Sequence, residues 1–250
     1  MRTLILLPLW LVLLGAGTGS AVRAAPAHPS RDTRALVRSL EARYHSAATL
    51  KATFLERYRE GGQDVRVESG TVYFRRPGRM RWEYESPEEK LFVADGKTVW
   101  FYVPADHTVS RAPMKESADW RTPLALLTGK TRLSRLCGRI EPAVASSSAG
   151  LPSGHALLHC TPRGAAQGRQ TQGAVRAPER SESFQEVLFE VDEARNDLVR
   201  VLIRQPGGIE IEYRFGNWQE NLPLAETMFH FQAPPGVAIV DEASIGGPGR

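Results

Sequence analysis

Residues 72–103 restrict the fold of this chain more than any other segment, because three β-strand patterns follow one another there with almost no spacer. Met80, Trp82 and Tyr84 alternate with charged residues, which is the period-two pattern of a strand with one apolar face. Arg-Pro-Gly and Asp-Gly turns separate this strand from its neighbours. The segment therefore predicts an antiparallel sheet with an aromatic inner face.

Residues 1–24 predict a secretory signal peptide. Arg2 supplies a positive start, Leu4 to Leu14 form an apolar run, and Val22-Arg23-Ala24 fits the small-x-Ala rule, so we expect cleavage after Ala24. The apolar run is shorter than the roughly 20 residues of a membrane-spanning helix. An N-terminal anchor is the alternative. Export places the aromatic sheet outside the cytoplasm.

Residues 25–250 are expected to form a single domain, and their length suits one large β domain or two small ones. Loss of the signal peptide lowers the formal net charge from +4 to +2 because it removes two arginines. This weakly basic balance gives no support for nucleic-acid binding. Residues 162–183 lack apolar periodicity and predict a mobile insertion, and residues 241–250 predict a loose tail.

Cys137 and Cys160 are the two cysteines of the chain, and a turn signal at residues 145–150 lies between them. If the flanking stretches form a hairpin, the cysteines face each other across it. An oxidising compartment then favours a disulfide. Two buried free thiols are the alternative.

Helical and strand patterns together predict a mainly β (α+β) fold. Leu36, Leu40 and Tyr44 follow at i+4 spacing and predict a helix over residues 31–46, and residues 122–127 predict a short middle helix. About ten or eleven antiparallel strands fill the rest of the domain, and these include Leu133 to Ile140, Ile209 to Phe215 and Thr227 to Phe231. Meander connections favour a half-open barrel or a strongly curved sheet. The two helices are the candidates for a lid over its concave face.

No catalytic motif was found, so the sequence predicts a protein that is not an enzyme and uses no cofactor. It contains no Gly-x-Ser-x-Gly, His-Glu-x-x-His or P-loop pattern. His155 and His159 stand four residues apart on a predicted strand, a separation of about 13 Å that prevents both from binding one ion. We therefore predict no metal site.

The chain resembles the periplasmic outer-membrane lipoprotein carrier (LolA) family from about Leu36 to about Val240. The resemblance rests on a set of short stretches in a specific order: Leu50 to Phe54, Arg75 to Gly78 with Arg81-Trp82, Val93 to Tyr102, Thr122 to Leu124, and Pro234 to Val237.

The resemblance implies a half-open β-barrel with helices as a lid over an apolar cavity, in the periplasm of a Gram-negative bacterium. Such a monomeric carrier accepts triacylated lipoproteins from an inner-membrane lipoprotein-releasing ABC transporter. It delivers them to an outer-membrane lipoprotein acceptor, without covalent chemistry. By position, Arg76 is the family's arginine that hydrogen-bonds to the lid and keeps the empty cavity closed, and the lid helix contains Leu124, Ala125 and Leu126.

We expect ten apolar residues to line the acyl-chain cavity: Tyr44, Phe54, Val72, Phe74, Met80, Trp82, Tyr84, Leu124, Leu126 and Leu127. Large aromatic and thioether side chains suit this role because they offer much apolar surface and tolerate several chain shapes. The alternatives are an ordinary sheet core for these residues and a solvated side chain for Arg76. The basic string of Arg75, Arg76, Arg79 and Arg81 is expected to make the cavity rim positive.

The alternative function is a lipid- or lipoprotein-sensing half-barrel of the cell envelope without transfer activity. A structural domain with a filled core is a further alternative.

Overall fold

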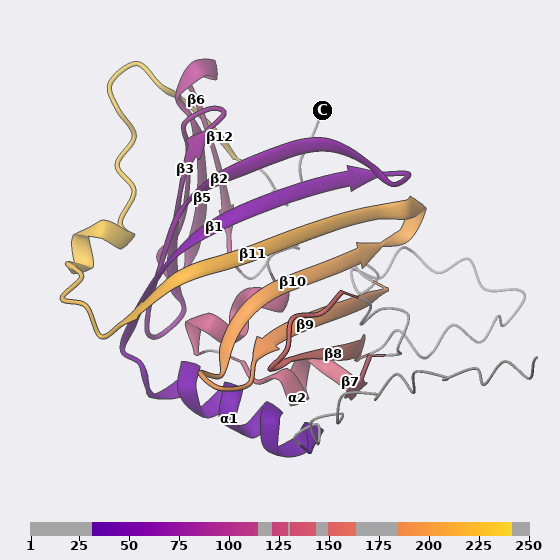
Figure 1. Cartoon of the computed structure of the whole chain (residues 1–250). Coiled ribbons are helices and arrows are strands. Elements are labelled where there is room, and N and C mark those ends of the chain that lie inside the picture. The colour runs from indigo at the N-terminus through magenta and orange to yellow at the C-terminus, as the bar shows by residue number, and fades with distance from the viewer. Residues whose placement is uncertain (1–31, 115–121, 130, 144–149, 164–184, 242–250) are drawn as a thin grey trace, which may run out of the picture.

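The computed structural model describes residues 32–114, 122–129, 131–143, 150–163 and 185–241 (Figure 1). The expected signal peptide, residues 164–183 of the expected insertion and residues 242–250 of the expected tail lie outside these ranges. Pro162 is the last residue of a strand, and Asp241 also belongs to a strand. No helix within the described ranges is long and apolar enough to span a membrane.

The fold is mainly β, with one sheet of 12 strands and few helices in the described part of the chain. The strands are β1 (Thr49–Glu60), β2 (Gln63–Arg75), β3 (Arg79–Ser86), β4 (Lys90–Ala94), β5 (Thr98–Val103), β6 (Thr108–Pro113), β7 (Cys137–Pro142), β8 (His155–Pro162), β9 (Glu186–Asp192), β10 (Asp197–Gln205), β11 (Ile209–Glu220) and β12 (Ala238–Asp241). The helices are α1 (Thr33–Ser46) and α2 (Leu133–Leu136), with the 3-10 helices η1 (Pro104–Asp106), η2 (Thr122–Thr128), η4 (Pro206–Gly208) and η5 (Glu226–Phe229).

The strand order is β12-β6-β5-β4-β3-β2-β1-β11-β10-β9-β8-β7, so distant parts of the chain meet inside the sheet, where β1 pairs with β11. Neighbouring strands are antiparallel except β12, which runs parallel to β6. Among the described strands β12 and β7 are the two edges, so the sheet is open. Figure 1 shows the long strands β1, β2, β10 and β11 curving away from α1, which lies across one end of the sheet.

The strand count and two element types differ from the sequence-based expectation. The sheet has 12 strands where about ten or eleven were expected. Thr227 to Phe231 is wrong as a strand, since η5 occupies Glu226–Phe229. Its apolar alternation reflects packing, because Phe229 is buried and Phe231 stacks beside Trp100 at 5.5 Å. Leu133–Leu136 is the helical turn α2, and the expected strand begins only at Cys137.

The inner face of the sheet holds the core, as the period-two patterns predict. Leu50, Phe74 and Met80 form one cross-strand row, and Ala52, Val72 and Trp82 form the next along the strands. Every one of these side chains is at most 5% exposed. The alternating residues point outward and carry most of the ion pairs of the sheet.

α1 attaches to the sheet through one apolar face and one polar end. Leu36, Leu40 and Tyr44, at i+4 spacing, are each at most 1% exposed. The backbone N–H of Leu198 donates to Tyr44 Oη at 2.8 Å. Arg43 forms an ion pair with Asp197 at 2.5 Å, so the last turn of α1 is fixed to the start of β10.

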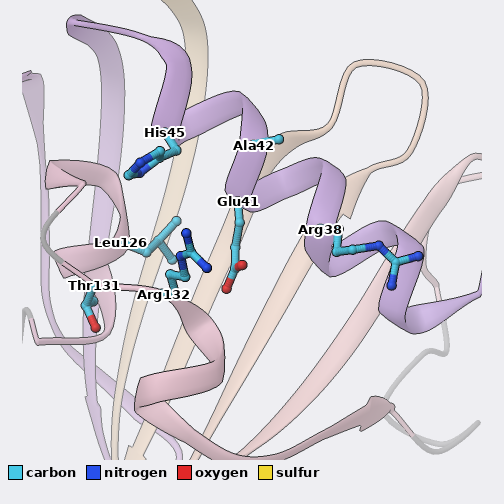
Figure 2. Close-up of a pocket in the computed structure, with 7 residues that line it drawn as sticks. All are labelled: Arg38, Glu41, Ala42, His45, Leu126, Thr131 and Arg132. Atoms are coloured by element: carbon cyan, nitrogen blue, oxygen red, sulfur yellow. The ribbon is translucent and has the colours of Figure 1, made fainter.

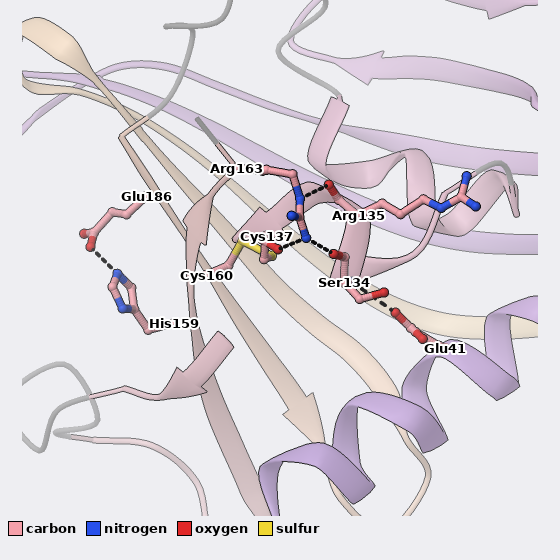
Figure 3. Close-up of a disulfide and its surroundings, with 8 residues drawn as sticks. All are labelled: Glu41, Ser134, Arg135, Cys137, His159, Cys160, Arg163 and Glu186. Carbon is pink, nitrogen blue, oxygen red and sulfur yellow. Dashed lines mark hydrogen bonds and ion pairs between the residues drawn. A yellow bond between two sulfur atoms is a disulfide. The ribbon is translucent and has the colours of Figure 1, made fainter. Parts of the chain in front are cut away.

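Cys137 and Cys160 form a disulfide that joins β7 to β8 (Figure 3). The pairing confirms the disulfide interpretation, but the two residues are not directly opposite in the ladder. Cys137 lies opposite Pro162 and Cys160 lies opposite Ile140, and the register of β7 shifts between Cys137 and Arg139. Arg163, just beyond β8, donates to the carbonyl oxygens of Ser134 at 2.7 Å and Arg135 at 3.3 Å and so caps the end of α2.

Gly70 on β2 is expected to be intolerant of a side chain. A β-bulge at Ser69 and Gly70 brings the strand so close to β3 that a Cβ atom on Gly70 would overlap the backbone carbonyl of Glu83. Gly70→Ala should lower the free energy of unfolding by roughly 3 kcal/mol, because backbone on both strands must shift. Gly216→Ala is the matched control on β11, where the nearest atom is the Thr53 hydroxyl at 3.4 Å. Urea unfolding of both variants checks this, and equal losses would contradict it.

Removal of the disulfide is expected to weaken the domain without changing its fold. The two cysteines are 23 residues apart, and closure of a loop of that length contributes about 3 kcal/mol in the chain-entropy model. The double variant Cys137→Ser and Cys160→Ser should lose this amount in urea unfolding. Wild-type protein unfolded and refolded in reductant is the control and should match the variant. An unchanged unfolding midpoint would contradict the expectation.

Alkaline pH should destabilise the contact between α1 and β10 through Tyr44. Burial raises the pKa of the Tyr44 hydroxyl above its ordinary value. The folded-state pKa of Tyr44 is higher than its unfolded-state pKa of ~10, so its contribution to the free energy of unfolding is complete below pH ~10. Above that pH the free energy of unfolding falls by about 1.4 kcal/mol per pH unit. Tyr44→Phe should therefore show a shallower decline in unfolding free energy above pH ~10. Identical slopes for both proteins would refute the assignment.

Candidate functional site

The inner-face residues predicted from the sequence form a continuous aromatic cluster. Trp82 on β3 lies at its centre and is fully buried. The centroid of its ring lies 4.8 Å from that of Phe54 on β1 and 6.0 Å from that of Phe74 on β2, and both pairs meet edge to face. Tyr84 contacts Phe54 at 5.0 Å, and Trp82 Nε1 donates to the Met80 sulfur at 3.4 Å. Edge-to-face pairs of this kind stabilise the cluster beyond the effect of area alone.

The helices close over the same cluster. Tyr44 of α1 and Leu124, Leu126 and Leu127 of η2 all belong to it, and each is at most 3% exposed. The structure thus brings all ten predicted lining residues together in one buried set. A hollow among them stays a prediction.

The aromatic residues that β11 adds to this cluster were not identified from the sequence. Tyr213 and Phe215 lie beside Trp82 at 5.4 and 6.2 Å, and Trp218 contacts Tyr44 at 5.3 Å. The alternation of Ile211, Tyr213 and Phe215 could have identified the first two. Trp218 breaks that alternation, because the register of β1 and β11 shifts near Gly216.

Arg76 lies where the turn after β2 meets both helices. Its guanidinium donates to the carbonyl oxygen of His45 at the end of α1. It also packs so closely against Gly129, just after η2, that a Cβ atom there would lie 2.7 Å from Arg76 Nε. The Gly78 N–H donates to the Thr128 carbonyl at 3.2 Å and ties the same turn to η2.

The guanidinium of Arg76 is poorly solvated in this position. Burial lowers the pKa of Arg76 from its ordinary value. Within the described residues, Nε and Nη2 are buried and have no hydrogen-bond partner. This position therefore gives the cation one hydrogen bond to His45 but leaves part of its charge uncompensated within the described residues.

The expected positive rim is wrong for three of its four arginines. Arg75, Arg79 and Arg81 point to the outer face of the sheet and hold residues 221–231 against it. Their partners are the Leu224 carbonyl at 2.6 Å, the Glu226 carboxylate at 2.7 Å and the Met228 carbonyl at 3.1 Å. Period two explains the difference, since odd-numbered residues of β3 face away from Trp82.

The described pockets lie at the edges of the aromatic cluster. One of about 220 Å³ opens between α1 and the segment from η2 to α2 (Figure 2). Its walls are Arg38, Glu41, Ala42, His45, Leu126, Thr131 and Arg132. Leu126 is the one residue that this pocket shares with the predicted lining set, so the pocket marks the seam between the two helices.

The two histidines on β8 contact different carboxylates. His155 contacts Glu190 at 2.8 Å, and His159 contacts Glu186 at 2.8 Å (Figure 3 shows the second pair). Among the described residues no group of three His, Cys, Asp or Glu side chains could hold a metal ion.

Three comparisons relate the chain to known proteins. The family model for outer membrane lipoprotein carrier protein LolA matches residues 45–140, a range that includes Arg76 and β1 to β6. The outer-membrane lipoprotein carrier protein of Nitrosospira multiformis is 26% identical over 82% of this chain and 87% of its own length. The protein of the same name from Nitrosomonas europaea is 28% identical over 82% of this chain and 88% of its own length.

An uncharacterized conserved protein from Thermus thermophilus has a similar fold, with a TM-score of 0.50, 14% identity and coverage of 84% of this chain and 100% of its own. The family model covers η2 and the aromatic strands β1 to β3, and the relatives extend the match over most of the chain. The chain is thus similar to the outer membrane lipoprotein carrier protein LolA family, at 26–28% identity over 82% of its length.

Proposed function

We propose that this protein is a periplasmic carrier that binds the acyl chains of lipoproteins released from the inner membrane and delivers them to the outer membrane. The main support for the proposal is that the chain is similar to lipoprotein carrier proteins and also has a large buried aromatic face. Relatives named outer-membrane lipoprotein carrier proteins match 82% of the chain, and the matched region contains the large aromatic face under two helices. No covalent chemistry is needed for this task.

The remaining parts of the proposal come from the sequence and the family. Residues 1–24 direct export to the periplasm. The cargo is triacylated lipoprotein, which a monomeric carrier receives from an inner-membrane lipoprotein-releasing ABC transporter and passes to an outer-membrane lipoprotein acceptor. Each methylene of an acyl chain that is exposed to water costs about 0.8 kcal/mol, so three chains need a shielded path across the periplasm.

α1 and η2 act as the lid in this proposal. Tyr44 and Leu124 are buried against the sheet, so cargo reaches the aromatic face only when one or both helices move. The pocket at the seam between α1 and η2 marks where they separate. The expected cavity then forms as acyl chains take the place of the lid side chains.

Arg76 sets the balance between the closed and loaded states. Its hydrogen bond to the His45 carbonyl is charge-assisted and contributes about 1.5–3 kcal/mol to the closed state. Because two other guanidinium nitrogens lack a partner within the described residues, desolvation offsets part of this gain. Cargo therefore opens the lid readily, yet the lid still competes with it, and cargo moves to an acceptor that binds it more tightly.

Arg76→Leu should leave the protein folded and able to take up lipoprotein but poor at handing it over. Loss of the latch stabilises the loaded state relative to the closed one, and 1.4 kcal/mol corresponds to a factor of ten in an equilibrium constant. We expect at least a tenfold fall in transfer of labelled triacylated lipoprotein from purified carrier to outer-membrane vesicles.

Arg214→Leu is the matched control, since Arg214 pairs with Glu212 on the outer face, far from the lid contacts of Arg76. It should transfer at the wild-type rate. Wild-type transfer by Arg76→Leu would refute the latch. A wild-type protein that holds lipoprotein and never releases it to acceptor vesicles would support the sensing alternative, and a protein that binds no lipoprotein would refute the carrier proposal.

A further inference from the structure

The inner face of the sheet does not stay apolar along its whole length. On β1, Glu56 follows Phe54 on the same face, and on β2 Glu68 occupies the position directly opposite Glu56. The side chains of Glu56 and Glu68 are 2% and 4% exposed, so they are as buried as the aromatic residues beside them. Two carboxylates thus lie side by side on the inner face of β1 and β2, with Tyr213 of β11 opposite Glu56 and the buried Tyr58 beyond it on β1.

Basic side chains neutralise these carboxylates. Arg66 Nε lies 2.8 Å from Glu68 Oε2, and Arg66 Nη2 lies 3.9 Å from Glu56 Oε1. Lys90 Nζ contacts Glu68 Oε1 at 2.7 Å, and Tyr84 Oη donates to Glu56 Oε2 at 2.8 Å. The four charged residues form a polar row with no net charge, which is the arrangement that a buried ion cluster requires.

The position of the polar row fits the end of a hydrocarbon site. The lid lies at the other end of the strands, where the Arg76 N–H donates to the Ala48 carbonyl just before β1. From Leu50 to Phe54, the last apolar inner-face residue of β1 before Glu56, is about 13 Å at the rise of a β-strand. One leaflet of a bilayer holds about 15 Å of hydrocarbon, half of the ~30 Å core. The apolar part of the face is thus about as long as one acyl chain.

We propose that the polar row of Glu56, Glu68, Arg66 and Lys90 is the end stop of the acyl site and sets the longest hydrocarbon chain that the carrier can bury. This inference rests on the proposed carrier function. A methylene buried against the apolar rows improves affinity by about fourfold. A methylene pushed into the polar row must separate paired buried charges, which costs far more than it gains. Chain length beyond the row therefore adds no affinity.

A homologous series of straight-chain fatty acids, competed against a fluorescent fatty acid, tests the end stop. Wild-type affinity should rise by about fourfold per methylene and then become constant at a break point. The triple variant Glu56→Met, Arg66→Met and Tyr84→Phe removes one acid, one base and one hydroxyl, and it leaves the ion pair of Glu68 and Lys90 intact. Its break point should move to longer acids. Acids two methylenes beyond the wild-type break point should bind about sixteenfold more tightly to this variant than to wild type.

Arg57→Met with Glu212→Met is the matched control. This variant removes an acid and a base whose charged atoms are 3.6 Å apart on the outer face of β1 and β11, so its break point should equal that of wild type. If the triple variant fails to fold, Glu56→Met with Arg66→Met carries the same expectation.

The outcomes separate the end stop from the carrier function. A break point that is the same in wild type and in the row variants overturns the end stop and leaves the carrier function standing. Wild-type affinity that rises without a break also overturns the end stop. A wild-type protein that binds no fatty acid of any length refutes the acyl-binding function and, with it, this inference.

Discussion

Burial of one aromatic sheet face is the constraint on which the rest of the structure depends. Trp82 and its neighbours present a large apolar surface on one side of an open 12-stranded sheet, and such a surface must be covered. α1 and η2 supply the cover. The same burial that stabilises the fold therefore defines the site, because any ligand of this face has to compete with the protein's own helices.

In the proposed mechanism, competition between the lid and the cargo requires lid contacts that are specific but not strong. Arg76 meets this requirement, since it links the turn after β2 to the end of α1 and to Gly129 after η2, and its cation is only partly compensated within the described residues. A fully satisfied buried ion pair at this point would hold the lid more firmly. The disulfide and the cap of α2 by Arg163 hold the β7 edge of the sheet together.

Charged residues have different roles on the two faces of the sheet. On the outer face, Arg75, Arg79 and Arg81 hold residues 221–231, and the aromatic side chain of Phe231 packs beside Trp100. On the inner face of β1 to β4, the polar row interrupts the apolar surface at a defined depth. A sheet in which every inner residue was apolar would have no internal limit on the length of a bound chain.

Much of the fold and of the aromatic site could be predicted from the sequence, because both depend on local patterns of apolar residues. The i+4 spacing of Leu36, Leu40 and Tyr44 determined α1, and period two placed Trp82 on the buried face. Period two could not identify which arginines lie at the lid, since Arg76 is in a turn and its partner carbonyl on His45 comes from another element. The pairing of Glu56 with Glu68 and the position of Trp218 also depend on register and on a bulge. Side-chain periodicity is a local property of the chain, whereas ladder register and the contact between a turn and two helices are set only when distant segments pack together.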